Sequence, residues 1–205
     1  MYQLENGWVQ SVKQVPSPNY DLRPENIEIS LLVIHGISLP PGIFDNEFVE
    51  EFFTNQLDHT KDPYFEQLIN LKVSSHLYIK RSGEIIQFVS LDHRAWHAGL
   101  SEYNGRSNCN DFSIGIELEG TENIKYTNQQ YMSLIELSKC CIHNYSKLTI
   151  DQIVGHSKIS PGRKTDPGVL FDWQYFLNNF SSLINPLLNV LIDLVVSPSG
   201  FLIRI

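Results

Sequence analysis

Three short apolar segments, each closed by a polar residue, place the strongest constraint on how this chain folds. The segments span residues 29–34, 112–118 and 150–155, and the polar residues at or near their ends are His35, Glu117 and His156. Short apolar runs rich in Ile, Val and Leu predict buried strands. Because a rigid sheet holds the side chains at strand ends at fixed separations, the pattern favours a site built from these three polar residues.

The sequence between these predicted strands contains patterns typical of a helix, a hairpin and a loop. Residues 75–80 and 85–89 predict two strands joined by a turn at Arg81-Ser82-Gly83, which is typical of a hairpin. Residues 47–57 have the composition of a helix whose phenylalanines contact the core. Residues 91–111 are rich in Gly, Asn and polar side chains, so we expect a loop there.

The clearest helix signal follows Thr127. Thr127 and Gln130 match a capping box, and apolar residues then recur at helical spacing as far as residue 145. A last helix is predicted to begin after Asp172 and to end near residue 180. Strands and helices in this order predict a mixed α/β fold, with a central mixed sheet flanked by helices.

The length of the chain bounds its domain organisation. A chain of 205 residues suits one domain with a substantial core, which we expect over residues 1–182, with residues 1–26 as an extended N-terminal arm. Residues 183–205 form an apolar tail of unknown role. Its most apolar part, 183–196, is interrupted by Pro186 and Asp193 and is shorter than the roughly 20 residues of a membrane span.

The charge balance and the cysteine content bear on partners and compartment. Acidic side chains outnumber basic ones by 23 to 15, giving a formal net charge of -8, whereas a nonspecific nucleic-acid binder normally carries a basic excess. Cys109, Cys140 and Cys141 are odd in number and two of them are neighbours, so we expect no disulfide framework. Reduced thiols and an N-terminus without a secretory pattern indicate a cytoplasmic protein.

His35, His156 and Asp166 are candidates for a metal site. Zinc in catalytic sites commonly takes histidine nitrogens and a carboxylate, and leaves one position for water. Asp166 follows His156 by ten residues across a loop rich in Pro and Gly, so its carboxylate can fold back toward the histidine. The alternative is that a histidine at a strand end is only a hydrogen-bonded structural residue.

Longer motifs surround these candidates. They are Leu31-Leu-Val-Ile-His35, Ile37-Ser-Leu-Pro-Pro-Gly42, Arg94-Ala-Trp-His-Ala-Gly99, Cys109-Asn-Asp-Phe-Ser-Ile-Gly-Ile-Glu-Leu-Glu-Gly120, and Gly155-His156 followed by Gly162-Arg-Lys-Thr-Asp-Pro-Gly168. Together they resemble the zinc-dependent N-acetylmuramoyl-L-alanine amidases of the AmpD type, over about residues 5–180. The resemblance implies an amidase/peptidoglycan-recognition-like fold and one zinc ion bound by His35, His156 and Asp166. It also implies catalytic roles for Glu117 and Lys164.

The same resemblance implies a reaction. Enzymes of this kind hydrolyse the amide bond between the lactyl group of 1,6-anhydro-N-acetylmuramic acid and L-alanine of muropeptides, in cytoplasmic peptidoglycan recycling, and influence β-lactamase induction. Glu117 would act as the general base, and Lys164 would stabilise the oxyanion. The expected partner is an anhydromuropeptide. Neither a membrane nor an obligate protein partner is expected.

The polar loop over 91–111 supplies candidates for substrate contacts. Trp96 could stack on a sugar or pack in the core, His97 could support a metal ligand or face substrate, and Arg106 could grip an anionic group. Asn108 stands where we expect a second base. Because the substrate carries carboxylates, we expect a local positive field from the bases near the motifs, namely Arg94, Arg106, Arg163 and Lys164.

Other functions remain open at this point. One is a non-catalytic peptidoglycan-recognition module, but such binders typically lack a complete ligand set. Another is a phage-type or exported amidase acting on intact peptidoglycan. A third is an interaction protein that uses the apolar tail. The presence of both histidines and Asp166 favours an enzyme.

Overall fold

The computed structural model describes residues 2–182, and the chain divides after Phe171 into two compact units. The first unit contains the sheet and the candidate site, and the described part of the second is helix α4 (Trp173–Ser182). The predicted cap is present, because the carboxylate of Asp172 accepts a hydrogen bond from the backbone N–H of Tyr175 at 2.8 Å. The apolar tail over 183–205 lies outside the described residues. Of the described helices, none is long and apolar enough to cross a membrane.

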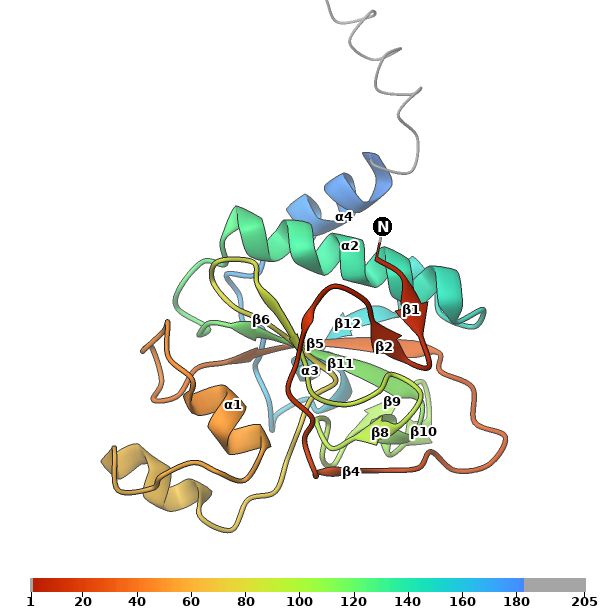
Figure 1. Cartoon of the computed structure of the whole chain (residues 1–205). Coiled ribbons are helices and arrows are strands. Elements are labelled where there is room, and N and C mark those ends of the chain that lie inside the picture. The colour runs from red at the N-terminus through yellow and green to blue at the C-terminus, as the bar shows by residue number, and fades with distance from the viewer. Residues whose placement is uncertain (1, 183–205) are drawn as a thin grey trace, which may run out of the picture. The chain divides into compact units, whose positions relative to one another are not determined.

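A six-stranded mixed sheet forms the centre of the first unit (Figure 1), as predicted. Its strands lie in the order β12-β5-β11-β6-β7-β3. Their bounds are Lys13–Gln14 (β3), Leu31–Ile37 (β5), Leu77–Ile79 (β6), Ile85–Gln87 (β7), Ser113–Glu119 (β11) and Ile153–Gly155 (β12). Strands β12, β5, β11 and β6 pair in parallel, and β6 and β7 form the predicted antiparallel hairpin. The fully buried apolar start of β5 is typical of a central parallel strand.

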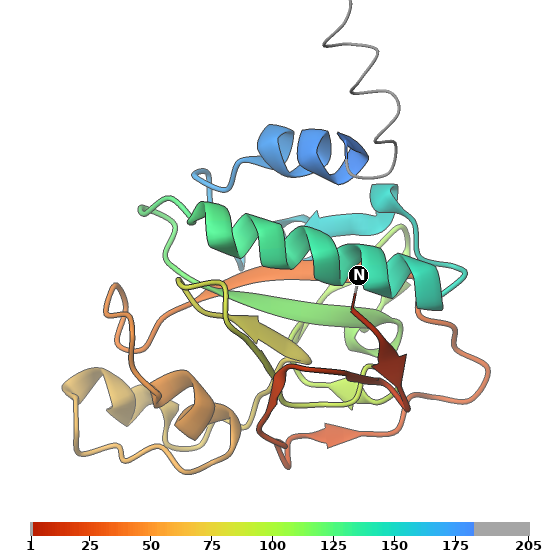
Figure 2. The ribbon, with the colours of Figure 1, turned by 45° about the horizontal axis from the view of Figure 1, so that its top comes forward.

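Helix α2 (Asn128–Asn144) runs along one face of this sheet (Figure 1 and Figure 2). Its predicted capping box is confirmed: the Thr127 hydroxyl accepts from the N–H of Gln130 at 3.1 Å, and the Gln130 side chain accepts from the N–H of Thr127 at 3.0 Å. These bonds satisfy N–H groups that a helix start leaves without partners. Cys140 and Cys141 lie buried on α2 as free thiols.

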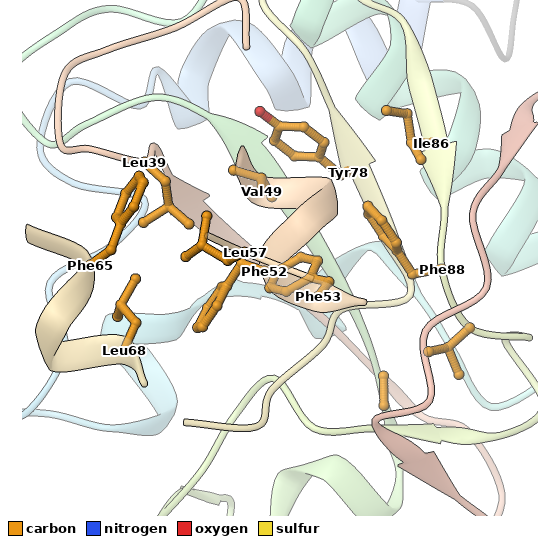
Figure 3. Packing of buried hydrophobic residues seen from close by; sticks show 12 residues of the cluster. Leu39, Val49, Phe52, Phe53, Leu57, Phe65, Leu68, Tyr78, Ile86 and Phe88 are labelled. Atoms are coloured by element: carbon orange, nitrogen blue, oxygen red, sulfur yellow. The ribbon is translucent and has the colours of Figure 1, made fainter. Parts of the chain in front are cut away.

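The opposite face of the sheet is covered by α1 (Phe48–Phe53) and the 3-10 helix η1 (Pro63–Leu68). Large side chains from both helices pack against strands β6 and β7 in one core cluster (Figure 3), which includes Phe52, Phe53, Leu57, Phe65, Leu68, Tyr78, Ile86 and Phe88. Tyr78 is the register partner of Glu117. This aromatic core therefore adjoins the face of the sheet from which Glu117 projects.

The N-terminal segment is attached to the first unit at several points. Strands β1 (Leu4–Glu5) and β2 (Trp8–Val9) form a short hairpin, β3 joins the edge of the central sheet, and β4 (Tyr20–Asp21) pairs with β8 (Arg94–Ala95). The buried side chain of Gln87 accepts from the N–H of Val9 at 2.7 Å and donates to the carbonyl of Gly7 at 2.8 Å.

Three local predictions differ from the structure. The helix expected over 47–57 ends at Phe53, because Asn55 takes a left-handed φ of 60° that stops the helix. The strand expected over 150–155 is wrong in its first half, where Thr149 and Gln152 form a second capping box and residues 150–152 form the 3-10 helix η3. The loop expected over 91–111 contains β8, β9 (Glu102–Tyr103), β10 (Arg106–Ser107) and the 3-10 helix η2 (Cys109–Asp111).

Candidate active site

Strand register brings together the three polar residues that close the apolar segments. His35 on β5 is paired with Glu117 on β11, so both side chains leave the same face of the sheet. On the other side of β5, Gly155 is paired with Ile34. The next residue, His156, therefore lies beside His35, where it begins helix α3 (His156–Ile159). Parallel strands thus deliver all three residues to one sheet edge, where open α/β sheets commonly bind ligands.

Asp166 completes a compact group with the two histidines. Nδ1 of His35 lies 2.9 Å from Nδ1 of His156, and Oδ2 of Asp166 lies 3.3 Å and 3.1 Å from these nitrogens. The loop that carries Asp166 is held on α3 by a hydrogen bond from the N–H of Ser157 to the Asp166 carbonyl at 3.0 Å. Gly155 permits this approach, since a Cβ there would lie 2.7 Å from Pro167.

The chemistry of this group suits a metal ion. Nε2 of His156 lies 3.1 Å from the carbonyl oxygen of Ala98 and 3.4 Å from Nη2 of Arg163, which itself donates to that carbonyl at 2.7 Å. The shorter contact, to an atom that only accepts, favours a proton on Nε2 and leaves Nδ1 as an acceptor. Burial opposes ionisation of Asp166, but the side chains of His156 and His35 beside its carboxylate hold the pKa of Asp166 below its usual value. Burial lowers the pKa of His35 to about 4, so His35 is neutral at pH 7. These atoms form a group that could hold a metal ion, and two nitrogens with one carboxylate match catalytic zinc sites.

Glu117 stands beside the group without a strong partner of its own. Its Oε1 lies 4.0 Å from Nδ1 of His35, and within residues 2–182 its buried Oε2 meets no hydrogen-bond donor. Burial and the charge of Asp166 raise the pKa of Glu117 well above its ordinary value, and the charge of Lys164 opposes this rise. A carboxylate with a raised pKa and an unused oxygen is suited to exchange protons with substrate or water.

A cavity of about 620 Å³ opens over these residues. Its polar lining includes the His35–His156–Asp166 group, Glu117, Arg163 and the exposed Lys164. Its apolar and aromatic lining comes from α1, η1 and neighbouring loops and includes Leu39, Pro41, Phe52, Tyr64, Leu71 and Trp96. A lining of both kinds suits a ligand that has charged and less polar parts.

The three residues predicted to contact substrate lie in different places in the structure. Trp96 is half-buried and lines the cavity, and His97 is buried behind His35, with its Nδ1 2.9 Å from Nε2 of His35. Arg106 lies elsewhere: its guanidinium sits 3.8 Å over the ring of Phe112 and donates to Ser30 at 3.2 Å.

Only some of the basic residues that were predicted to create a local positive field lie at the cavity. Arg94 is bound by Asp21 and Asp111 at 2.6 Å and 2.5 Å. Arg163 and Lys164 remain as the members of the predicted basic group that line the cavity.

Sequence reasoning missed several residues that position the site. The Tyr126 hydroxyl donates to the carbonyl of Pro167 at 2.9 Å and touches the backbone beside His35, where a Cβ at Gly36 would lie 2.4 Å from it. The side chain of Asn110 accepts from the N–H groups of His97 and Ala98 at 3.2 Å and 2.8 Å. Gly36, directly after His35, is a local signal of close packing, but no spacing in the sequence identifies its partner.

A family profile described as N-acetylmuramoyl-L-alanine amidase matches residues 25–169. The chain belongs to this family. Among its curated relatives, the 1,6-anhydro-N-acetylmuramyl-L-alanine amidase AmpD of Escherichia coli strain K12 is 49% identical over 173 residues, which cover 84% of this chain and 94% of that protein. AmpD of Citrobacter freundii is 48% identical over 183 residues, or 89% of this chain and 95% of that protein.

Solved structures agree with this membership. A crystal structure of a selenomethionine derivative of AmpD matches with a TM-score of 0.84 and 48% identity, over 86% of this chain and 98% of that chain. A complex of the amidase AmiD from Escherichia coli with anhydro-N-acetylmuramic acid-L-Ala-D-gamma-Glu-L-Lys matches with a TM-score of 0.54 and 28% identity, over 86% and 65%. The predicted fold class is confirmed, and the chain is an N-acetylmuramoyl-L-alanine amidase.

Proposed function

We propose that this amidase hydrolyses the bond between the lactyl group of 1,6-anhydro-N-acetylmuramic acid and L-alanine of soluble muropeptides, with one zinc ion held by His35, His156 and Asp166. The observation that carries the proposal is the convergence of two histidine nitrogens and an ionised carboxylate oxygen, all within 4.8 Å of one another, beside the unpartnered oxygen of Glu117. Three acceptors without a proton to share repel one another unless a cation lies between them.

The protein residues divide the work of amide hydrolysis. A bound zinc ion supplies Lewis-acid polarisation of the scissile carbonyl and lowers the pKa of the attacking water. Glu117 takes a proton from that water at Oε2 and returns it to the leaving amine of L-alanine. Its raised pKa suits both steps, because a carboxylate with a pKa nearer neutrality accepts and releases a proton more readily.

Lys164 supplies the positive charge for the oxyanion. Its charge lowers the pKa of both His35 and Glu117, so its field reaches the reacting region. We expect Lys164→Met to lower kcat by about 10²-fold, the usual effect of losing one stabilising group at an oxyanion. Lys158→Met is the matched control, because Lys158 is an exposed lysine of α3. Equal kcat values for both variants would remove Lys164 from the mechanism.

We propose the anhydro sugar as part of the substrate because related proteins act on it or bind it. The AmpD proteins of Escherichia coli and Citrobacter freundii are named for this sugar, and the AmiD structure holds an anhydro-N-acetylmuramyl tripeptide. The apolar lining of the cavity, with Trp96, offers surface for a sugar ring with few free hydroxyl groups, and Arg163 and Lys164 offer charge for peptide carboxylates. With this substrate, we propose that the enzyme acts in peptidoglycan recycling in the cytoplasm. In bacteria with an inducible β-lactamase, its removal of the muropeptide would lower induction.

A comparison of substrates tests the proposal. The zinc-loaded protein is incubated with anhydro-N-acetylmuramyl-tripeptide and, separately, with intact peptidoglycan sacculi. Release of a peptide with a free L-alanine amine is then followed by mass spectrometry. We expect rapid release from the soluble anhydromuropeptide and slow release from sacculi. Preferential cleavage of sacculi would overturn the substrate assignment in favour of an amidase of phage or exported type.

A further inference from the structure

A chain of hydrogen bonds runs from the metal-binding group into the protein behind His35. Nε2 of His35 lies 2.9 Å from Nδ1 of His97, and Nε2 of His97 lies 3.1 Å from the hydroxyl of Ser113. The Ser113 hydroxyl lies 2.6 Å from the carbonyl oxygen of Cys109. His35, His97 and Ser113 are all buried, so water does not compete for these bonds.

The carbonyl oxygen of Cys109, at the end of this series of hydrogen bonds, determines which atom donates in each bond. A carbonyl oxygen cannot donate, so the single hydrogen of the Ser113 hydroxyl points at Cys109. Ser113 must then accept from His97, which places the proton of His97 on Nε2 and leaves its Nδ1 bare. A bare Nδ1 can only accept, so the proton of His35 lies on Nε2 and points at His97.

We infer that Ser113 and His97 are positioning residues, which hold His35 in the tautomer whose bare Nδ1 faces the metal. Without them, a neutral His35 could place its proton on Nδ1 and donate to Asp166, 3.3 Å away. That proton would have to leave before a cation could bind. The inference deepens the proposed function, on which its biological meaning rests.

The packing of the His97 ring agrees with this arrangement. Gly115 on β11 leaves room for the ring, since a Cβ there would lie 2.4 Å from Cγ of His97. The ring is thereby pressed onto the strand that also carries Ser113 and Glu117.

A direct test reads the tautomer in the full chain. The protein is labelled with 15N-histidine, stripped of metal with a chelator, and studied by long-range 1H–15N correlation at pH 7.5. We expect His35 and His97 both to show a protonated Nε2 and an unprotonated Nδ1. A proton on Nδ1 of His35, or shifts averaged between the two tautomers, would overturn the inference.

A pair of serine variants tests the consequence for metal binding. Ser113→Ala removes the hydroxyl that orients His97, whereas Ser75→Ala removes a buried hydroxyl that donates to the carbonyl of Gly115 at 2.8 Å. Zinc affinity is measured by competition with a chromogenic chelator. We expect Ser113→Ala to bind zinc about 10- to 100-fold more weakly than the wild type, and Ser75→Ala to bind zinc with unchanged affinity. In metal-free Ser113→Ala we also expect the 15N shifts of His35 to be averaged between its two tautomers.

The outcomes separate this inference from the proposed function. Wild-type zinc affinity in Ser113→Ala, or equal losses in both variants, would contradict a specific positioning role. If Ser113→Ala does not fold, the tautomer measurement on the wild-type chain still decides. Failure of the protein to cleave anhydromuropeptide would count against the proposed substrate. It would not change the result of the tautomer measurement on His35.

Discussion

Glu117 Oε1 lies 4.0 Å from Nδ1 of His35 because the two residues are register partners on the parallel strands β11 and β5. Their separation is therefore set by backbone hydrogen bonds of the sheet and not by a flexible loop. A site built on paired strands keeps its geometry with little loss of side-chain entropy. The base and the metal ligand of the proposed mechanism are held in this way.

Glu117→Gln tests the general base. The amide keeps the size of the side chain but cannot take a proton, so we expect kcat to fall by at least about 10²-fold while zinc content stays at that of the wild type. Both are measured on the same purified preparation, by peptide release and by metal analysis.

Glu119→Gln is the matched control for this change. Glu119 lies on the same strand and is also buried, but its two oxygens accept from the N–H groups of Asp45 and Arg81. We expect this variant to keep its kcat. Full activity in Glu117→Gln, or the same loss in both variants, would exclude a specific role for Glu117.

Removal of metal should lower thermal stability, because an ion that binds only the folded state adds to its stability. We expect a chelator to lower the Tm of the wild-type protein and to leave the Tm of Asp166→Ala unchanged. The latter variant lacks the carboxylate that lies 3.1 Å and 3.3 Å from the two histidine nitrogens. Differential scanning fluorimetry with and without chelator measures both. An equal chelator effect on both proteins would remove Asp166 from the ligand set.

Trp96 and Arg106 should differ in their effect on substrate binding. Trp96 lines the cavity, so we expect Trp96→Ala to raise KM about tenfold, equivalent to about 1.4 kcal/mol of lost binding. Arg106 lies over Phe112, so Arg106→Ala should leave KM within about twofold, since surface changes of this kind usually have small effects. Steady-state kinetics with anhydromuropeptide compares them. A larger rise in KM for Arg106→Ala would show that the arginine reaches substrate.

His76 should make the stability of the protein depend on pH. Its Nδ1 accepts from the N–H of Gly115 at 3.0 Å, so the ring is neutral with its proton on Nε2. Nε2 lies 3.0 Å from the carbonyl oxygen of His93 and 3.2 Å from Nη2 of Arg23. Burial, and then the charge of Arg23, lower the pKa of His76 well below 6.5. Because the unfolded chain binds a proton first, this contribution to stability is present above pH 6.5 and is lost as the pH falls below it.

The measurement for His76 is urea unfolding of metal-free wild type and His76→Gln at pH 7.5 and 5.5. We expect the stability advantage of the wild type to shrink at the lower pH by about 1.4 kcal/mol for each pH unit below 6.5. The use of metal-free protein keeps the loss of metal at low pH out of the comparison. An advantage that is the same at both pH values would contradict a neutral buried His76.

Local patterns in the sequence predicted much of the fold. The apolar runs before His35 and Glu117 predicted β5 and β11, and the Thr127–Gln130 pair predicted the start of α2, because strand burial and helix capping depend on residues close in sequence. The same local chemistry was missed at Thr149 and Gln152, where a capping box replaced the first half of a predicted strand.

By itself, the sequence determined the fold class, the family and the candidates His35, His156, Asp166, Glu117 and Lys164, since all of these depend on residue types at short spacing. Only the tertiary structure decided which candidates meet. Strand register brings His35 next to Glu117 and His156. Ser113 and His97 lie behind His35. Arg106 packs on the ring of Phe112, away from the cavity. These relationships join segments that lie far apart along the chain, and pairing and packing choose their partners through the free energy of the whole folded unit.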